Sequence, residues 1–397
     1  MNQRELFLRH VAQTSDTPMM GVDVNIVSAK GCVLTDANGK EYIDLISGIS
    51  VSSVGHCHPK VVEAVQQQSS KFMHLMVYGE FNQAPQVAYA KALCDQLPPT
   101  LQSVYFTTGG SEAVEGALKL AKRVTGRPHI VSFKNAYHGS THGALSVMGS
   151  EVFKSVYRPL LPGTELLDLN DTSALQKIDE RVAAVIIEPI QGEAGVRKAD
   201  PAFLKALQQR CHQQGALLIF DEIQSGFART GRLFAFEHYD CVPDILLLAK
   251  GMGGGMPIGA FVASRDLMQH LTHDPILGHI NTFGGNAVCA AAALATLKVI
   301  IDDNLCARAR AIETRVKEKL QHRCIKELRI HGALGAIEFE SEDLNFKIVK
   351  ACLEDGLISD WFLFCSQAMR IAPPLTISDQ ELEVALDRLL KVFDSMK

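Results

Sequence analysis

The sequence lacks three features that would place it in specialised classes of protein: long apolar runs, an excess of positive charge and paired cysteine spacings. A membrane-spanning helix requires about 20 consecutive apolar residues, and no segment of the sequence approaches this length. The 39 basic and 44 acidic side chains give a formal net charge of −5, and no basic run exceeds "AKR" at 121–123. The composition therefore indicates neither a membrane span nor a nucleic-acid partner.

Export signals and metal-site spacings are also missing. Residues 1–18 contain no apolar core followed by a small-residue cleavage site, so we expect a cytoplasmic protein. The ten cysteines are scattered along the chain, and in a reducing compartment we expect them to be free and mostly buried. The "HCHP" stretch at 56–59 has no second ligand pair at zinc-site spacing. We therefore expect no metal there and interpret the stretch as a turn before a helix that begins at Pro59.

Apolar segments alternate with amphipathic segments through the middle of the 397-residue chain. The apolar segments predict strands at 103–107, 129–134, 183–188, 216–221, 245–249 and 258–263. The amphipathic segments predict helices at 59–70, 83–96, 111–124, 151–156, 172–179, 201–214 and 285–301. Such alternation is typical of an α/β fold in which helices cover both faces of a mostly parallel sheet.

The two ends of the chain have a different pattern and predict a smaller α+β unit. Residues 24–46 contain two or three short strands around an Asn-Gly turn. Later in the chain, the expected elements are a helix at 305–321, strands near 328–340, and helices at 343–355 and 379–396. We therefore expect residues 1–52 and 291–397 to form a small domain together, and residues 53–290 to form a large domain.

Polar residues follow five of the predicted strands at the point where each strand ends. Ligands of open α/β sheets bind beyond the carboxyl ends of the strands, so these residues are expected to meet at one edge of the sheet. The segments are "TGGSE" (108–112), "NAYHGS" (135–140), "EPIQGE" (188–193), "DEIQSG" (221–226) and Lys250.

The "TGGSE" segment combines two glycines with the start of a helix. Glycines let backbone N–H groups approach a ligand and the helix N-terminus is partially positive, so Gly110 and Ser111 are candidates for phosphate binding. The alternative is an ordinary helix start with Ser111 or Thr108 as the N-cap residue. No G-x-G-x-x-G dinucleotide motif occurs at this position.

Asp221 ends the apolar stretch "ALLIF", where a carboxylate is unfavourable unless it meets a cation or a donor. One such partner is the protonated nitrogen of a pyridine ring. A rival is the magnesium-binding acid of a nucleotide hydrolase, because "ALLIFDE" also resembles a Walker B strand. That rival requires a G-x-x-x-x-G-K-[ST] loop, which the chain does not have.

Lys250 follows the apolar strand 245–249 and precedes a glycine-rich loop. An amine beside apolar surface loses preference for its charged form, so its pKa falls and it becomes a nucleophile for aldehydes. Glycines 251 and 253–255 are expected to leave space for a flat cofactor. A lysine that extends into solvent is the alternative.

Two further residues near these segments suit a planar ligand. Tyr137 follows a strand and can place its ring against such a ligand, although core packing is the alternative. Gln224 lies three residues after Asp221 and can reach a phenolic oxygen. A phosphate cradle, an acid for a ring nitrogen, an aromatic face and an aldehyde-binding lysine together indicate pyridoxal 5′-phosphate.

These motifs resemble those of the class III aminotransferases, which are pyridoxal-phosphate enzymes of fold type I. The resemblance extends from "GKEYIDLISGISVSSVGHCHP" to "MRIAPPLTIS", and "DEIQSGFARTG" with "LAKGMGGGMPIGA" is its most specific part. It implies a large domain with a mostly parallel seven-stranded sheet covered by helices, and a smaller α+β domain built from both chain ends.

The resemblance implies a role for each residue toward the cofactor. Lys250 would form the Schiff base with the cofactor aldehyde, and Asp221 would pair with its pyridine nitrogen. Further contacts would come from Gly110 and Ser111 on the phosphate, Tyr137 on the ring face with His138 beside it, Gln224 on the ring hydroxyl, and Glu188 nearby. Thr282 would bind the phosphate in the neighbouring subunit, which implies a homodimer with shared active sites.

The resemblance also implies how substrates are held. Arg370 would bind the carboxylate of the amino acid or oxo acid, and Glu193 would pair with Arg370 when no dicarboxylate is bound. The implied reaction is ping-pong transamination from an amino acid or ω-amine donor, of the acetylornithine or 4-aminobutyrate kind, to an oxo acid such as 2-oxoglutarate. A decarboxylase or aminomutase on the same fold and a non-catalytic binding protein are alternatives. The full set of cofactor residues disfavours the last of these.

Two positions depart from the family pattern. Ser140 occupies the place of an arginine that usually binds the donor's distal carboxylate, and Ile49 that of a tyrosine in the ornithine branch. Either another cation, such as Arg127 or Lys134, replaces that arginine, or the donor has no carboxylate there. Trp361, the only tryptophan, is expected to pack in the core rather than shape the pocket.

Overall fold

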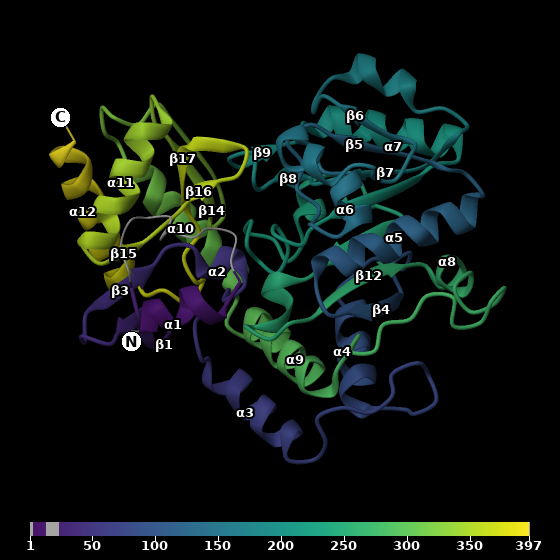
Figure 1. Cartoon of the computed structure of the whole chain (residues 1–397), viewed down its shortest axis with the longest axis horizontal. Helices are drawn as coiled ribbons and strands as arrows, with labels where there is room; N and C mark the ends of the chain where they lie inside the picture. Colours follow the sequence, from purple (N-terminus) through teal and green to yellow (C-terminus); the bar gives the residue numbers. More distant parts are fainter. Residues whose placement is uncertain (1–2, 13–23, 397) are drawn as a thin grey trace.

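The computed structural model describes residues 3–12 and 24–396, so part of the N-terminal segment expected to carry no export signal lies outside the described residues. Its centre is a seven-stranded sheet of order β4-β12-β11-β10-β7-β5-β6 (Figure 1). The strands are β4 (Ser103–Thr107), β5 (His129–Phe133), β6 (Thr164–Leu167), β7 (Val182–Ile187), β10 (Leu217–Asp221), β11 (Ile245–Leu248) and β12 (Gly259–Ala263). Only β12 runs antiparallel to its neighbours, which confirms the predicted mostly parallel sheet.

The sequence pattern predicts six of these strands and misses β6. This strand reads "TELL" and lies at the edge of the sheet, where it pairs only with β5 and has one buried position. By contrast, every position of β7 and β11 is buried, because helices cover these central strands on both sides. An edge strand lacks the continuous apolar run by which the central strands are recognised.

Helices α5 (Gly110–Thr125) and α7 (Pro201–Gln214) cover opposite faces of the sheet. The side chain of Ile219 packs in one apolar cluster with α5, whereas Leu218 and Phe220 pack in another with α7. Neighbouring residues of a strand point to opposite faces, so β10 separates the two clusters. The carboxyl ends of the strands stay uncovered between these layers.

Strands from the two ends of the chain share a sheet. β3 (Glu41–Asp44) pairs in parallel with β15 (Leu357–Ile358), and the sheet has the order β1-β2-β3-β15 (Figure 1). A second four-stranded sheet has the order β13-β14-β17-β16. The remaining strands of both sheets are β1 (Ile26–Lys30), β2 (Val33–Asp36), β13 (Glu327–His331), β14 (Leu334–Glu338), β16 (Trp361–Phe362) and β17 (Cys365–Ile371). The chain ends thus build one α+β unit as predicted, while the exact domain boundaries stay a prediction.

Most predicted helices agree with the structure to within two residues. These are α3 (Pro59–Ser69), α4 (Ala84–Cys94), α9 (Ala287–Asp302), α10 (Leu305–Lys319), α11 (Glu342–Glu354) and α12 (Asp379–Ser395). The helices predicted at 151–156 and 172–179 are wrong, because these segments form only short 3₁₀ turns at Glu151–Phe153, Ser155–Tyr157 and Thr172–Lys177. Together they bury a single residue, Leu175, and a helix without a packed apolar face gains little stability.

Several short elements complete the fold. They are α1 (Gln3–His10), α2 (Ser47–Ser50), α6 (His142–Ser146), α8 (Arg265–Gln269), β8 (Ile190–Gln191), β9 (Arg197–Lys198) and 3₁₀ turns at Ala235–His238 and Lys250–Gly253. The ten cysteines are free thiols, six of them buried, as predicted. Within residues 3–12 and 24–396, every helix falls short of the length and apolar character needed to cross a bilayer.

Candidate active site

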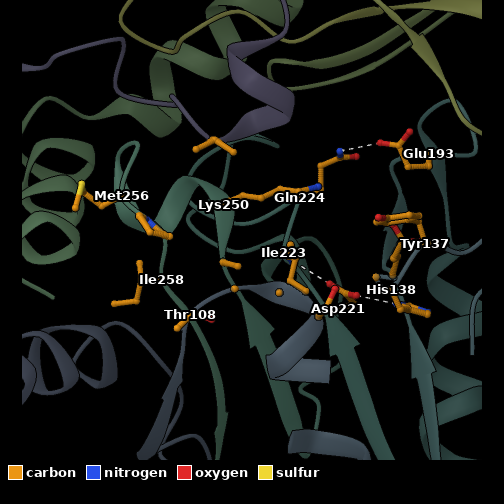
Figure 2. A pocket seen from close by; sticks show the side chains of 18 of the residues that line it. Thr108, Tyr137, His138, Glu193, Asp221, Ile223, Gln224, Lys250, Met256 and Ile258 are labelled. Atoms are coloured by element: carbon orange, nitrogen blue, oxygen red, sulfur yellow. Dashed lines mark hydrogen bonds and ion pairs between the residues drawn. The ribbon is translucent and has the colours of Figure 1, made fainter. Parts of the chain in front are cut away.

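The predicted polar segments meet at one cavity of about 430 Å³ at the carboxyl ends of the strands (Figure 2). This volume lies within the roughly 300–1,000 Å³ that cofactor and ligand sites occupy. All five segments contribute to its wall, through Gly110, Ser111, Tyr137, His138, Glu188, Glu193, Asp221, Gln224 and Lys250. The structure therefore brings together nearly all of the residues selected from the sequence.

Lys250 enters this cavity from the end of β11 (Figure 2). Its backbone has a φ of 47°, a left-handed conformation that lysine rarely adopts, so the chain turns sharply where the buried strand ends. Its amine has no hydrogen bond or ion pair within the part of the chain that the structure describes. Burial lowers the pKa of Lys250, and this effect outweighs the nearby charge of Glu193, which acts in the opposite direction.

Two of the glycines after Lys250 have a different role from the predicted one. A Cβ on Gly251 would lie 3.0 Å from Ser53 Oγ, and a Cβ on Gly254 would lie 2.2 Å from Thr296 Oγ1. Gly251 and Gly254 therefore let the Lys250 turn pack closely against neighbouring segments. Of the four glycines, only Gly255 lines the cavity, and it leaves space there as predicted, because a Cβ on it would meet nothing within 4 Å.

Asp221 lies at the end of β10 and is buried. Its Oδ2 lies 2.7 Å from Nδ1 of the buried His138, and its Oδ1 accepts the backbone N–H of Ile223 at 3.0 Å (Figure 2). A carboxylate only accepts hydrogen bonds, so Nδ1 of His138 carries the proton. These two donors fix the orientation of the Asp221 carboxylate.

Glu188 connects two of the segments beneath the cavity. Its carboxyl group accepts the backbone N–H of Tyr137 at 3.0 Å and that of Gly192 at 3.1 Å. Burial raises the pKa of Glu188 well above its ordinary value, and the charge of Asp221 adds to this effect. Glu188 thereby positions the backbone of Tyr137, whose ring faces the cavity (Figure 2).

The start of α5 leaves its N-terminus open at the cavity. The residue before the helix is Gly109, and no side chain caps the helix, so the alternative of an ordinary helix start capped by Ser111 or Thr108 does not hold. The N–H groups of a first helical turn lack intrahelical acceptors and attract anions. A Cβ on Gly110 would lie 2.8 Å from Ile223 Cδ1, so a larger residue there would have to displace the Ile223 side chain at the cavity wall.

A buried polar cluster adjoins the cavity. Arg370 Nη2 lies 3.1 Å from both carboxylate oxygens of Glu193. Gln224 Nε2 donates to Glu193 Oε1 at 3.1 Å, as Figure 2 shows. Burial opposes the charges of both ion-pair partners, yet their attraction lowers the pKa of Glu193 and raises that of Arg370. Arg370 Nη1 and Gln224 Oε1 are buried with no hydrogen-bond partner. These two atoms are free to bind an incoming polar ligand.

Thr282 is the predicted site residue that lies elsewhere. It does not line this cavity, and its hydroxyl group lies 3.4 Å from that of Tyr78. The predicted contact of Thr282 with a phosphate in a neighbouring subunit stays a prediction.

The predicted replacements for the missing arginine are wrong. Arg127 donates to the backbone carbonyls of Val182 at 3.1 Å and Gln214 at 2.6 Å, and Lys134 Nζ lies 2.8 Å from an oxygen of Asp168. Neither lines the cavity.

Sequence reasoning misses part of the site. The wall of the cavity includes the apolar residues Val51, Ile223, Met256, Pro257 and Ile258, and Asp360 binds Arg370 through its carboxylate at 2.8 Å. The position of Ile223 between Asp221 and Gln224 could have indicated that it lies at the site.

Trp361 packs against Phe346 with ring centroids 4.9 Å apart and does not line the cavity, in agreement with its predicted packing role.

The fold and this site are those of a transaminase. The family model described as Aminotransferase class-III matches residues 13–393, and the chain belongs to this family. It is similar to the acetylornithine aminotransferase of Methanopyrus kandleri, with 38% identity over 372 residues that cover 92% of this chain and 93% of that protein. The acetylornithine aminotransferase of Bacillus subtilis is 36% identical over 92% of this chain and 94% of its own. The crystal structure of ornithine aminotransferase from Toxoplasma gondii ME49 matches with a TM-score of 0.91 and 33% identity, over 100% of this chain and 96% of that chain. The predicted family and fold type are thus confirmed.

Proposed function

We propose that the protein catalyses pyridoxal-phosphate-dependent transamination from an amine donor of the acetylornithine or ornithine kind to an oxo acid, with 2-oxoglutarate as the acceptor. The observation that carries this proposal is the convergence of Lys250, Asp221 and the N-terminus of α5 on one cavity. The names of the similar acetylornithine and ornithine aminotransferases support the donor class.

The residues present fit this cofactor. The uncapped N-terminus of α5 suits the phosphate, Asp221 suits the ring nitrogen and Lys250 suits the aldehyde. The orphaned Gln224 Oε1 is an acceptor for the ring hydroxyl, and the Tyr137 ring borders the same space. When bound, pyridoxal phosphate supplies an electron sink for breaking bonds at the amino-bearing carbon.

The chain itself supplies proton transfer through Lys250. Because burial lowers its pKa, the amine is neutral at a lower pH than an exposed lysine would be. The neutral Nζ would take the proton from the amino-bearing carbon of the donor and release it within the first half of the reaction. In the second half it would deliver a proton to the corresponding carbon of the acceptor. Asp221, held by His138, presents its carboxyl group at the cavity wall for the ring nitrogen of the cofactor.

Arg370 and Glu193 allow one site to receive two substrates in turn. While Glu193 pairs with Arg370, the cavity suits a donor whose reacting end carries an amine and no carboxylate that must bind Arg370. An oxo acid with two carboxylates displaces Glu193 and takes its place on Arg370. This exchange matches the alternation of substrates in a ping-pong reaction.

The proposal includes a homodimer in which Thr282 reaches the partner's site. Apolar side chains near Thr282 are exposed, among them Phe283 at 57% and Ile276 at 74%. A second cavity, separate from the candidate active site, lies next to this segment. Exposed apolar side chains line it, including those of Val87, Leu277 and Ile280. A second copy of the chain that covers them would bury this surface.

A donor screen tests the proposed function. The protein loaded with pyridoxal 5′-phosphate is mixed with single amines, the visible spectrum is followed, and glutamate is measured after addition of 2-oxoglutarate. We expect acetylornithine or ornithine to change the spectrum and 2-oxoglutarate to restore it with formation of glutamate. If donors change the spectrum but no oxo acid restores it, the protein is a decarboxylase or an aminomutase and the proposal fails.

Variants of Lys250 test the assignment of the lysine. Lys250→Ala is expected to fold and to lose the visible absorption of the loaded enzyme together with its turnover. Lys205→Ala, which alters an exposed lysine of α7, serves as the control and should behave as the wild type. Full turnover of Lys250→Ala would contradict the assignment.

A further inference from the structure

Arg370 is held by its own hairpin as well as by Glu193. Its side chain is 1% exposed, and its Nε donates to Asp360 Oδ1 at 2.8 Å. The ring of Phe362 lies 4.3 Å from Arg370 Cζ, and the carbonyl of Trp361 accepts from Nη2 at 3.3 Å. Three consecutive residues, 360–362, therefore surround the guanidinium on sides that Glu193 does not use.

The backbone fixes this arrangement. Residues 361–362 form β16, which pairs antiparallel with β17, the strand that carries Arg370. The Arg370 N–H donates to the Asp360 carbonyl at 2.9 Å, so both the main chains and the side chains of this pair are in contact. The backbone N–H of Leu363, in the same hairpin, donates to Glu193 Oε2 at 3.2 Å. The position of Arg370 thus depends on the hairpin and not on Glu193 alone.

The exchange of Glu193 for a substrate carboxylate poses a charge problem. A buried guanidinium that loses its carboxylate partner is strongly unfavourable. Asp360 is a second carboxylate on the same guanidinium, and it stays in place because its backbone carbonyl accepts the Arg370 N–H beside the start of β16. Arg370 therefore remains compensated while Glu193 moves.

The contacts of Arg370 also indicate which nitrogen atoms of its guanidinium group are available to a substrate. Nε is taken by Asp360, Nη2 by Glu193, and Nη1 is buried without a partner. Once Glu193 leaves, Nη1 and the Nη2 N–H that does not donate to the Trp361 carbonyl are available to bind a carboxylate through two hydrogen bonds.

We propose that Asp360 and Phe362 are positioning residues that hold Arg370 so that its Nη1 and Nη2 atoms bind the carboxylate of an oxo-acid substrate in place of Glu193. This inference rests on the proposed function, since it concerns the acceptor of the same site. Asp360 fixes the guanidinium through Nε, and Phe362 fixes its plane.

Binding of glutarate, an unreactive dicarboxylate, tests the inference without turnover. Isothermal titration calorimetry on the loaded enzyme compares the wild type with Asp360→Ala, Asp360→Asn and Phe362→Leu. We expect Asp360→Ala to weaken glutarate binding about 10-fold or more, because a charge-assisted hydrogen bond is lost. Asp360→Asn keeps an oxygen acceptor for Nε but not the charge, so it should recover only part of this loss. Asp302→Ala, at an exposed aspartate that ends α9, is the control.

Kinetics separate positioning from a merely structural role. The KM for 2-oxoglutarate should rise about 10-fold in Asp360→Ala, while the KM for an aldehyde acceptor without a carboxylate stays unchanged. Equal rises for both acceptors, or glutarate binding no weaker than in Asp302→Ala, would overturn the inference. If Asp360→Ala does not fold, Asp360→Asn and Phe362→Leu decide by the same two measurements. Failure of the proposed function is distinct, because the wild type itself would then lack transamination.

Discussion

His138 donates a hydrogen bond of 2.7 Å from Nδ1 to Asp221 Oδ2, and both side chains are buried beneath the cavity. The two residues come from segments that follow different strands, β5 and β10, which are separated in the sheet by β7. A buried carboxylate that loses a donor is destabilised and free to turn. The orientation of the Asp221 carboxylate at the cavity wall therefore depends on His138.

The first prediction concerns this hydrogen bond. His138→Ala should lower the affinity for pyridoxal 5′-phosphate about 10-fold or more, the usual effect of losing a hydrogen bond to a charged group. His138→Asn keeps a nitrogen donor and should fall between this variant and the wild type. Fluorescence titration of the cofactor-free protein measures the affinity. An exposed-site control, His142→Ala, should bind as the wild type does, and an unchanged affinity in His138→Ala would refute the prediction.

The second prediction concerns the pH dependence of stability through Glu222. This residue is 0% exposed, and burial raises its pKa from 4.5 to about 8 although the Ala235 and Phe236 backbone N–H groups donate to it. Between these two pKa values the folded protein binds the proton and the unfolded chain does not, so stability falls as pH rises from 4.5 to about 8. Glu222→Gln removes this titration.

Melting temperatures measured from pH 5 to pH 8 check this prediction. The difference in melting temperature between Glu222→Gln and the wild type should shift in favour of the variant as pH rises. The NH₂ group of the new glutamine side chain cannot accept a hydrogen bond from a backbone N–H, so we expect the melting temperatures of variant and wild type to differ by a constant amount at every pH. The change of this difference with pH, and not its size, therefore tests the prediction. Glu354→Gln, at an exposed glutamate, should show no such slope. Parallel curves for Glu222→Gln and the wild type would show that Glu222 does not titrate in this range.

The third prediction concerns Arg229, whose side chain is fully buried without a carboxylate in contact. Its Nη1 donates to the carbonyls of Ala333 at 3.2 Å and Pro373 at 2.6 Å, and its Nη2 donates to Ser53 Oγ at 2.9 Å. Burial lowers the pKa of Arg229 to about 10. The arginine thus joins the loop after β10 to segments from both ends of the chain.

Arg229→Ala should destabilise the protein by about 3 kcal/mol or more, because it leaves three buried acceptors without a donor. Arg229→Lys retains the charge but not the forked geometry, so an intermediate loss is expected. Urea unfolding followed by circular dichroism provides the measurement. A loss below about 1 kcal/mol for Arg229→Ala would mean that water or a rearranged side chain satisfies these acceptors.

The sequence predicts those features that depend on local pattern, and it misses those that depend on distant partners. β7, β11 and Lys250 are recognisable because a continuous apolar run and its abrupt end are visible in the chain. β6 has no such run, since it lies at the edge of the sheet. The contact of Asp360 with Arg370 arises from hairpin pairing across ten residues, and the packing of Gly254 against Thr296 from a distant helix. Neither contact can be predicted from the spacing of residues along the chain.

The last prediction concerns the donor. Ser140 is exposed, its hydroxyl lies 3.3 Å from that of Tyr137, and neither Arg127 nor Lys134 reaches the cavity. Within the described part of this chain, the cavity wall thus offers a distal carboxylate no guanidinium. Ser140→Arg should raise kcat/KM for 4-aminobutyrate about 10-fold, which corresponds to one charge-assisted hydrogen bond, and should leave amines without a carboxylate unaffected. Ser155→Arg, at an exposed serine outside the cavity wall, controls for added charge. If Ser140→Arg gains nothing on 4-aminobutyrate while wild-type turnover with carboxylate donors is already high, a cation from the partner subunit fills this place.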